Sequence, residues 1–288
     1  MGLSTNRVTE SYLDLDGDEI RYLRAGESEP PVVLLHGGGV DAAHLSWDPT
    51  LEALADDYRL FAPDLPGYGG SDAPNVSYSM DYFLDFLDVF LDGLGLEDAT
   101  LVGLSMGGGV ALGYALREPE RVAGLVLVNS YGLGSDPPRG TASMASPLAW
   151  TALRHNRALL RWGLGTIVAD RRTITDGMVA AAHRLLGRRH AGRAFRRFYR
   201  SETGSGSVVS NYSDRLSELS VPTLLVHGAD DDLVPVAWSR RARDRIPRAR
   251  LVVFENCGHW PPREKPEGFA RVVASFLADR QSNVPVER

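Results

Sequence analysis

The chain has 288 residues, of which 43% are hydrophobic and 24% are charged, and its formal net charge is −6. This composition is ordinary for a folded protein and excludes the disordered, collagen-like and disulfide-rich classes. The single cysteine, Cys257, excludes an internal disulfide, and the N-terminus lacks the basic and apolar regions of a signal peptide. Since no stretch approaches the ~18 apolar residues of a membrane span, we expect a cytoplasmic protein with no membrane partner.

The first elements predicted in chain order are strands. Residues 11–23 have the pattern of a β-hairpin that turns at Asp16-Gly17. Residues 31–35 and 60–62 are short apolar runs, typical of strands buried on both faces. Residues 79–94 predict an amphipathic helix whose polar face carries four aspartates, Asp81, Asp85, Asp88 and Asp92. This spacing is more typical of a solvated helix face than of a metal site.

Residues 103–107, Gly-Leu-Ser-Met-Gly, follow an apolar run and precede a stretch of small apolar residues suited to a helix packed on a sheet. Gly-x-Ser-x-Gly between a strand and a helix is the pattern of a nucleophile elbow. The tight turn requires residues almost without side chains two positions before and after Ser105. It also places the hydroxyl at a helix N-terminus, where N–H groups stabilise developing negative charge. Ser105 is therefore the candidate nucleophile.

Strand and helix patterns alternate after the elbow, with one interruption. Residues 124–128, 223–226 and 251–254 have the pattern of buried strands, whereas residues 135–216 predict only short helices. The alternation predicts an α/β fold with a mostly parallel twisted sheet and helices on both faces. Residues 135–215 are then a helical insertion in a core of residues 1–134 and 216–288. The polar tail after Asp279 is expected to fray.

The helical insertion is strongly basic. Residues 154–200 contain twelve arginines and only two acids, Asp170 and Asp176. The positive electrostatic field of these arginines could steer anionic substrates to the protein, or the arginines could bind an acidic surface. The pattern favours solvated helix faces instead. Because basic and aromatic residues do not interleave as in a nucleic-acid platform, we expect no nucleic-acid partner. An anionic small-molecule substrate and a homo-oligomer both stay open.

Two loops that follow predicted strands carry partners for a serine nucleophile, which needs a base, and the base needs an orienting acid. His259 follows the run 251–254 and is the candidate base. The candidate acids follow the run 223–226 and are Asp230, Asp231 and Asp232, among which spacing alone does not choose. We predict no metal and no cofactor, because no histidines or cysteines have metal-ligand spacing. Cys257 is expected to be a packed residue.

Together these motifs resemble the α/β-hydrolase family over about residues 12–280. The segments that carry the resemblance are His36-Gly-Gly-Gly, Asp64-Leu-Pro-Gly-Tyr-Gly-Gly-Ser, Gly103-Leu-Ser-Met-Gly, Gly228-Ala-Asp-Asp-Asp-Leu-Val-Pro and Gly258-His-Trp-Pro-Pro-Arg-Glu. The resemblance implies the α/β-hydrolase fold, with residues 135–215 as a cap over the active site. The family's Gly-x-x-Asp-x-x-Val-Pro pattern also implies that the acid is Asp231.

The resemblance further implies roles for the residues around the nucleophile. Ser105, His259 and Asp231 would form a catalytic triad, and the N–H groups of Gly38 and Met106 would form the oxyanion hole. The imidazole of His36 is expected to hold its loop in place and not to act as a base. The predicted substrate contacts are Gly37, Gly39, Leu104 and Trp260.

Within the family, the His-Gly-Gly-Gly loop, the Ser-Met-Gly-Gly elbow, Trp260 and the segment from Asn129 resemble hydrolases that cleave carbon–carbon bonds in ring-fission products of aromatic degradation. Two positions differ from that subgroup: Leu104 replaces an asparagine, and Ala182 stands near the place of an arginine that pairs with the substrate carboxylate. We therefore favour a carboxylic-ester hydrolase, with carbon–carbon bond hydrolysis as the alternative.

The same residues also bear on other functions that proteins of this fold can have. A haloalkane dehalogenase is disfavoured because it needs aspartate at position 105. A cofactor-free haloperoxidase or perhydrolase would use the same triad and stays open as a side activity. A non-catalytic ligand-binding protein is the second alternative, and the intact set of serine, acid and histidine argues against it.

Overall fold

The computed structural model describes residues 7–203 and 208–281, and its centre is an eight-stranded sheet with the order β1-β2-β4-β3-β5-β6-β7-β8. β1 pairs antiparallel with β2, and β2 with β4, whereas all the later neighbours are parallel. The predicted mostly parallel sheet is therefore confirmed. The strands are β1 (Val8–Leu15), β2 (Asp18–Ala25), β3 (Pro31–Leu35), β4 (Arg59–Pro63), β5 (Ala99–Leu104), β6 (Val122–Val128), β7 (Thr223–Gly228) and β8 (Ala249–Phe254).

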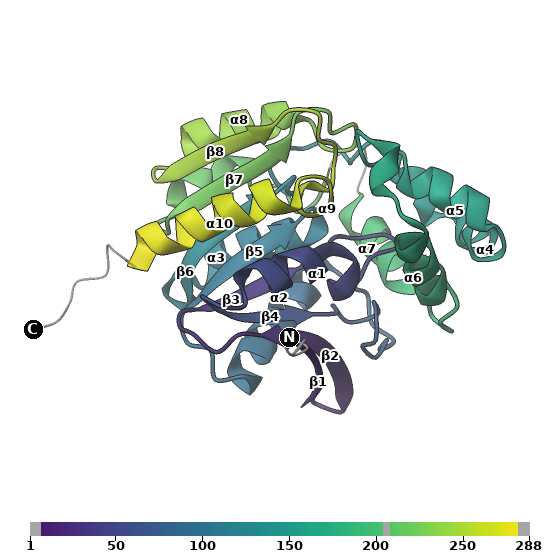
Figure 1. Cartoon of the computed structure of the whole chain (residues 1–288), viewed down its shortest axis with the longest axis horizontal. Coiled ribbons are helices and arrows are strands. Elements are labelled where there is room, and N and C mark those ends of the chain that lie inside the picture. The colour runs from purple at the N-terminus through teal and green to yellow at the C-terminus, as the bar shows by residue number, and fades with distance from the viewer. Residues whose placement is uncertain (1–6, 204–207, 282–288) are drawn as a thin grey trace, which may run out of the picture.

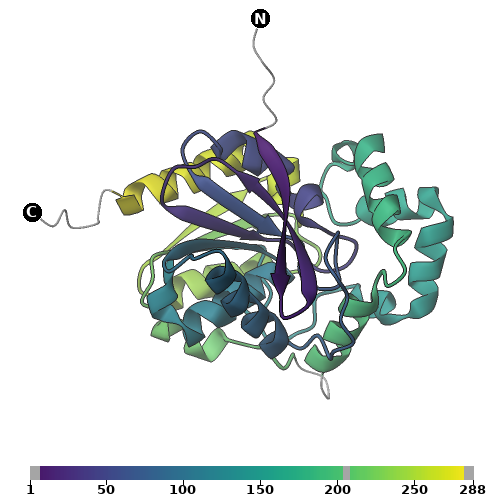
Figure 2. The ribbon, with the colours of Figure 1, turned by 90° about the horizontal axis from the view of Figure 1, so that it is seen from below.

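Helices cover both faces of this sheet, because its central strands are apolar on both sides. Every residue of β3, β5 and β7 is buried. One face carries α1, α9 and α10, and the opposite face carries α2, α3 and α8 (Figures 1 and 2). These helices are α1 (Ala43–Leu54), α2 (Met80–Gly93), α3 (Met106–Arg117), α8 (Val236–Arg245), α9 (Pro261–Glu264) and α10 (Pro266–Gln281).

The helix predicted at residues 79–94 is α2. The Ser79 side chain accepts a hydrogen bond from the Tyr82 N–H and so caps its N-terminus. Its aspartates are partly neutralised by the end of α3 and the turn after it: Arg117 pairs with Asp85, and Arg121 pairs with two further aspartates, Asp88 and Asp92. Three of the four aspartates of the polar face thus form ion pairs near the surface.

Between β6 and β7 the regular elements of the described chain are helices joined by loops, apart from one isolated β-bridge between Thr203 and Val208. They are η2 (Thr141–Ala145), α4 (Pro147–His155), α5 (Arg157–Leu164), η3 (Arg171–Thr173), α6 (Asp176–Leu186), α7 (Arg193–Glu202) and η4 (Ser213–Glu218); a further 3-10 turn, η1 (Pro119–Arg121), precedes β6. Helices α4 to α7 stand together beyond one end of the sheet (Figure 1), whereas η4 packs against α8. The division into a core and a separate cap at 135–215 stays a prediction.

The C-terminal helix extends slightly farther than the sequence predicted. α10 continues to Gln281, past the position at which a frayed tail was predicted, and the rest of that tail lies outside the described residues. No helix within the described ranges has the length and apolar character that crossing a membrane requires.

Candidate active site

Ser105 lies in the turn between β5 and α3, as the elbow pattern predicts. Its backbone is strained, with φ 51° and ψ −115°. A Cβ on Gly103 would lie 2.3 Å from the Gly107 carbonyl oxygen, and a Cβ on Gly107 would lie 2.3 Å from that of Leu35. The two glycines are required because any side chain there would collide with backbone. The Ser105 carbonyl oxygen also accepts a hydrogen bond of 3.0 Å from the Tyr131 N–H.

The loops after β7 and β8 bring Asp231 to His259. The His259 Nδ1 atom lies 2.7 Å from Asp231 Oδ2, and both side chains are buried. The neighbouring Asp230 and Asp232 are exposed, so the structure selects one of the three candidate acids. A proton assigned to Nδ1 by this hydrogen bond leaves the other ring nitrogen of His259, Nε2, free to accept a proton.

The Asp231 carboxylate is surrounded by donors. Oδ1 accepts hydrogen bonds from the N–H groups of Leu233 and Val234, at 2.8 and 3.1 Å. Burial alone would raise the pKa of Asp231. The charge of His259 and hydrogen bonds from His227, His259 and Asn129 outweigh it and hold this pKa well below its usual range. The carboxylate is therefore ionised beside His259 at neutral pH.

Asn129 and His227 complete this arrangement, and neither was singled out as a site residue from the sequence. Asn129 Nδ2 donates to Asp231 Oδ2 at 2.5 Å and to the Gly258 carbonyl oxygen at 3.2 Å. His227 is fixed between the Ser239 hydroxyl and the Val234 carbonyl oxygen. Only their positions in the sequence could have indicated a role in the site, because each is a polar residue at the end of a predicted buried strand.

The His36–Gly39 loop places backbone N–H groups beside the elbow. His36 joins this loop to the next one, since it accepts a hydrogen bond from the Leu65 N–H and contacts the Gly37 carbonyl oxygen. The Gly37 N–H donates to Asp41 Oδ2. In contrast, the N–H groups of Gly38 and Met106 have no acceptor among the residues that the structure describes. Both predicted oxyanion-hole donors are thus unoccupied.

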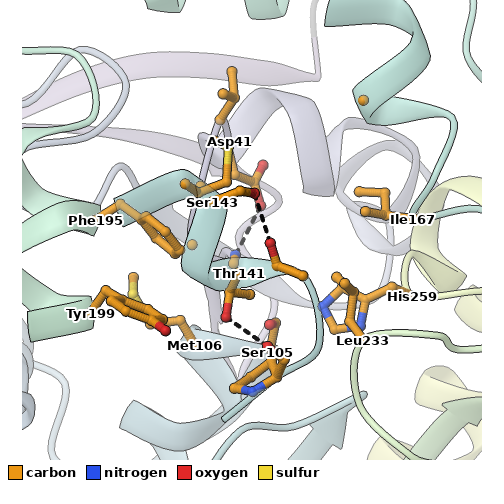
Figure 3. Close-up of a pocket in the computed structure, with 18 of the residues that line it drawn as sticks. Asp41, Ser105, Met106, Thr141, Ser143, Ile167, Phe195, Tyr199, Leu233 and His259 are labelled. Carbon is orange, nitrogen blue, oxygen red and sulfur yellow. Dashed lines mark hydrogen bonds between the residues drawn. The ribbon is translucent and has the colours of Figure 1, made fainter. Parts of the chain in front are cut away.

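Ser105 and His259 both line a cavity of about 460 Å³. In Figure 3, Phe195 and Tyr199 from α7 face one side of this cavity, and Ile167, Leu233 and His259 lie on the other. All the predicted substrate contacts line it, namely Gly37, Gly39, Leu104 and Trp260, as do Gly38 and Met106. Asp231 lies behind His259 and does not line the cavity.

The cavity wall is mainly apolar, with a few fixed polar groups. Trp260 Nε1 donates to the Ser46 hydroxyl at 2.9 Å, and this hydroxyl in turn contacts both carboxylate oxygens of Asp41. Burial raises the pKa of Asp41, in spite of these hydrogen bonds. No arginine, lysine, asparagine or glutamine lines the cavity in the described ranges. A carboxylate group of a ligand would therefore find no cation there.

Some arginines of residues 154–200, such as Arg184 and Arg200, are exposed, whereas others have specific partners outside the helical insertion. Arg188, Arg193 and Arg197 donate hydrogen bonds to the carbonyl oxygens of Gly70, Ala73 and Val76 respectively. Ala182, which stands near the place of the subgroup's arginine, is fully buried and does not line the cavity. The basic residues thus join α6 and α7 to the loop after β4, because guanidinium groups are multidentate donors to carbonyl oxygens.

The described residues provide neither a reactive cysteine thiolate nor a cluster of metal-binding side chains. Burial raises the pKa of the Cys257 thiol, with a further contribution from the negative charge of Glu264, so the reactive thiolate is disfavoured. Within residues 7–203 and 208–281, no group of three or more histidine, cysteine, aspartate or glutamate side chains is arranged to hold a metal ion.

Comparisons with known proteins agree with this geometry. A family model of the alpha/beta hydrolase fold matches residues 30–266. A 2-hydroxy-6-oxononadienedioate/2-hydroxy-6-oxononatrienedioate hydrolase of Burkholderia vietnamiensis is 34% identical, over 96% of this chain and 98% of its own. A 2-hydroxymuconate semialdehyde hydrolase of Pseudomonas sp. strain CF600 is 33% identical over 86% and 87%. The crystal structure of a meta-cleavage product hydrolase from Pseudomonas fluorescens has a TM-score of 0.83, 29% identity, and coverage of 96% and 99%.

These matches extend over almost the whole chain, and the relatives are named as hydrolases of ring-fission products. The strained serine elbow and the hydrogen-bonded Asp231–His259 pair stand where the family motifs predict them. The chain therefore belongs to the α/β-hydrolase fold family and is an enzyme of that family.

Proposed function

We propose that Ser105, His259 and Asp231 form a catalytic triad that hydrolyses a bond to a carbonyl carbon. The observation that carries this proposal is the Asp231–His259 hydrogen bond of 2.7 Å in the same cavity as a serine on a strained turn. The unpaired N–H groups of Gly38 and Met106 support their role as the oxyanion hole. Residues 135–215 would act as the cap that covers this site.

The proposed reaction has two stages. His259 takes the proton of Ser105 as the serine oxygen attacks the carbonyl carbon, and the resulting oxyanion accepts hydrogen bonds from Gly38 and Met106. Collapse of this intermediate breaks the bond to the leaving group, which receives the proton from His259. Water then attacks the acyl-enzyme with His259 as base, and this releases the acid and restores Ser105. Asp231 stays ionised and orients the imidazole throughout.

For the bond that breaks, we propose a carbon–carbon bond next to a ketone in a ring-fission product. The similarity to hydrolases of such products, at 34% and 33% identity over most of the chain, supports this choice. A carbon leaving group departs only if conjugation stabilises the negative charge that it takes with it. The 2-hydroxy-dienoate skeleton in the relatives' substrate names supplies that conjugation once the hydroxyl proton has moved to the departing carbon, because the negative charge is then delocalised onto the new 2-keto group.

A carboxylic ester is the second candidate substrate, and the cavity lining favours it. A dienoate carries a carboxylate, for which the described cavity wall offers no cationic or amide side chain. Leu104, next to the nucleophile, suits an apolar acyl group instead. An ester with apolar substituents needs no charged partner, and its alcohol is a good leaving group without conjugation.

A comparison of two substrate classes tests the function. We expect the wild-type enzyme to cleave a 2-hydroxy-6-oxo-dienoate with a kcat/KM at least ~10-fold above that for p-nitrophenyl butyrate, and Ser105→Ala to lower both by at least ~10³-fold. The reverse preference would replace the first proposal by the ester hydrolase. Failure of a folded wild-type protein to turn over either class, together with no labelling of Ser105 by a fluorophosphonate, would contradict the triad and favour a ligand-binding protein.

A further inference from the structure

The cavity wall contains a buried carboxyl group that the proposed reaction does not use. Glu202, the last residue of α7, lines the same cavity as Ser105 and is only 3% exposed. No arginine, lysine or histidine forms an ion pair with it in the described part of the chain. Burying an ionisable group without an opposite charge costs free energy. If this position were purely structural, a neutral side chain would fill it at a lower cost in folding free energy.

The contacts of Glu202 leave one of its oxygens available. Oε2 accepts hydrogen bonds from the Tyr131 hydroxyl and from the Ser210 N–H, both at 3.0 Å. Burial and the adjacent Glu202 charge raise the pKa of Tyr131, so the phenol keeps its proton and acts as the donor. Oε1 has no hydrogen-bond donor among the described residues. Because Glu202 lines the cavity, Oε1 is the oxygen with which we expect a ligand there to form a hydrogen bond.

The other acid in the cavity wall differs in this respect. Asp41 Oδ1 accepts from the Ala42 N–H, and Asp41 Oδ2 accepts from the Gly37 N–H. The Ser46 hydroxyl is also within 2.9 Å of both oxygens. Asp41 is thus fully engaged in holding the loop beside the elbow. Glu202 is the carboxyl group in the wall that can accept a further hydrogen bond from a ligand.

Tyr131 sets the distance between Glu202 and the nucleophile. Its backbone N–H donates to the Ser105 carbonyl oxygen at 3.0 Å, and its hydroxyl reaches Glu202. Glu202 therefore lies about one tyrosine side chain away from the elbow. Phe198 and Val208, both apolar, line the same cavity. A substrate attacked at Ser105 that extends along Tyr131 would end at Glu202.

We propose that Glu202 is a specificity-determining acceptor that binds a hydroxyl or ammonium group at the end of the substrate and disfavours a carboxylate there. This inference rests on the proposed function and specifies its substrate class. A buried carboxylate attracts a hydrogen-bond donor and repels a second anion. The Burkholderia relative is named for a dioate, which has a carboxylate at each end. We therefore expect the substrate of this enzyme to carry a neutral or donor group at the end that contacts Glu202.

Binding to the Ser105→Ala variant tests this subsite separately from catalysis. The probes are 4-phenylbutylamine, 4-phenylbutan-1-ol, 4-phenylbutyrate and the neutral hydrocarbon butylbenzene, measured by calorimetry at neutral pH. We expect the amine and the alcohol to bind at least ~10-fold more tightly than the carboxylate. If 4-phenylbutyrate binds as tightly as the amine and the alcohol, or more tightly, the proposal is wrong. This comparison needs no substitution at Glu202.

The second comparison adds Glu202→Gln, which keeps the size of the side chain and removes its charge. We expect the ratio of amine to carboxylate affinity to fall at least ~10-fold, while the affinity for butylbenzene changes by less than ~2-fold. Glu255→Gln, at an exposed position, is the matched control and should leave the ratio unchanged. An unchanged ratio in Glu202→Gln would mean that Glu202 only supports Tyr131 and Ser210. Absence of turnover in the wild type would contradict the proposed function and leave this binding result intact.

Discussion

Asn129 is the residue that connects the loops of the site. It follows β6 directly, and its side chain reaches Asp231 after β7 and the Gly258 carbonyl oxygen after β8. The side-chain oxygen Oδ1 of Asn129 also accepts a hydrogen bond of 3.3 Å from the Gly228 N–H. The backbone φ of 44° is in the left-handed region, which asparagine tolerates better than most residues. Asn129 thus fixes the acid relative to both neighbouring strand ends.

Replacement of Asn129 by alanine should therefore reduce catalysis more than binding. A hydrogen bond to a charged group contributes about 1.5–3 kcal/mol, so we expect Asn129→Ala to lower kcat by ~10- to 100-fold, with KM changed far less. Steady-state kinetics on the better of the two substrate classes would measure this. Ser217→Ala, at an exposed position away from the cavity, is the control. A kcat equal to that of the wild type would show that Asp231 needs no support from Asn129.

At the scale of elements, α7 forms one wall of the cavity and is held by its arginines. Phe195, Tyr199 and Glu202 line the cavity from this helix. On the same helix, Arg197 donates to the Val76 carbonyl oxygen at 2.6 Å and to Asn75 Oδ1 at 2.8 Å. Arg193 makes similar hydrogen bonds to the same loop. The basic segment therefore positions a cavity wall.

Loss of one of these connections should loosen α7 without affecting the nucleophile. We expect Arg197→Met to lower kcat/KM by ~3- to 10-fold, mainly through KM, because two hydrogen bonds from a charged donor are lost while an unbranched apolar stem is kept. Amide hydrogen exchange in residues 193–202 should become faster. Arg200→Met removes the same charge from an exposed position of α7 and should change neither quantity. Equal effects of both variants would point to the electrostatic field instead of the hydrogen bonds.

At the scale of the whole molecule, two aspartates give opposite dependences of stability on pH. Burial raises the pKa of Asp48, on α1, to about 6, although Arg263 and its positive charge oppose the shift. The unfolded chain releases this proton near pH ~4. The folded state therefore holds the proton more tightly, and this group makes stability fall as pH rises from about 4 to 6. Asp231 has a lowered pKa, so the stability that it contributes is fully present above pH ~4 and is lost progressively as pH falls below that value.

Asn cannot ionise, so Asp48→Asn should remove the fall in stability that Asp48 causes. We expect the variant to be more stable than the wild type at pH ~8 by on the order of 1 kcal/mol, after allowance for solvent screening, and equal to it at pH ~4. Thermal unfolding at both pH values would measure the difference in Tm. Asp57→Asn, at an exposed position, is the matched control. The same Tm difference at both pH values would exclude ionisation of Asp48 as the cause.

Local patterns in the sequence were enough to predict the sheet and the strained turn that carries Ser105, the proposed nucleophile. Strands such as β3 and β5 are buried on both faces and so appear as continuous apolar runs, and α2 shows a helical period with its cap at Ser79. Ser105 needs glycine two positions away on each side because a Cβ there would touch backbone. These requirements act over a few neighbouring residues, so they are visible in the sequence itself.

Only the tertiary structure decided which side chains from distant segments meet. Spacing left three candidate acids, and the hydrogen bond to His259, 28 residues away in the chain, selects Asp231. Nothing in the sequence distinguished Arg188, Arg193 and Arg197 from the exposed arginines around them, because their acceptors lie in the distant loop after β4. Glu202 had no motif at all, since its significance depends on Tyr131, 71 residues earlier, and on the absence of a nearby cation. Such pairings arise from packing between elements, and no local pattern of residues encodes them.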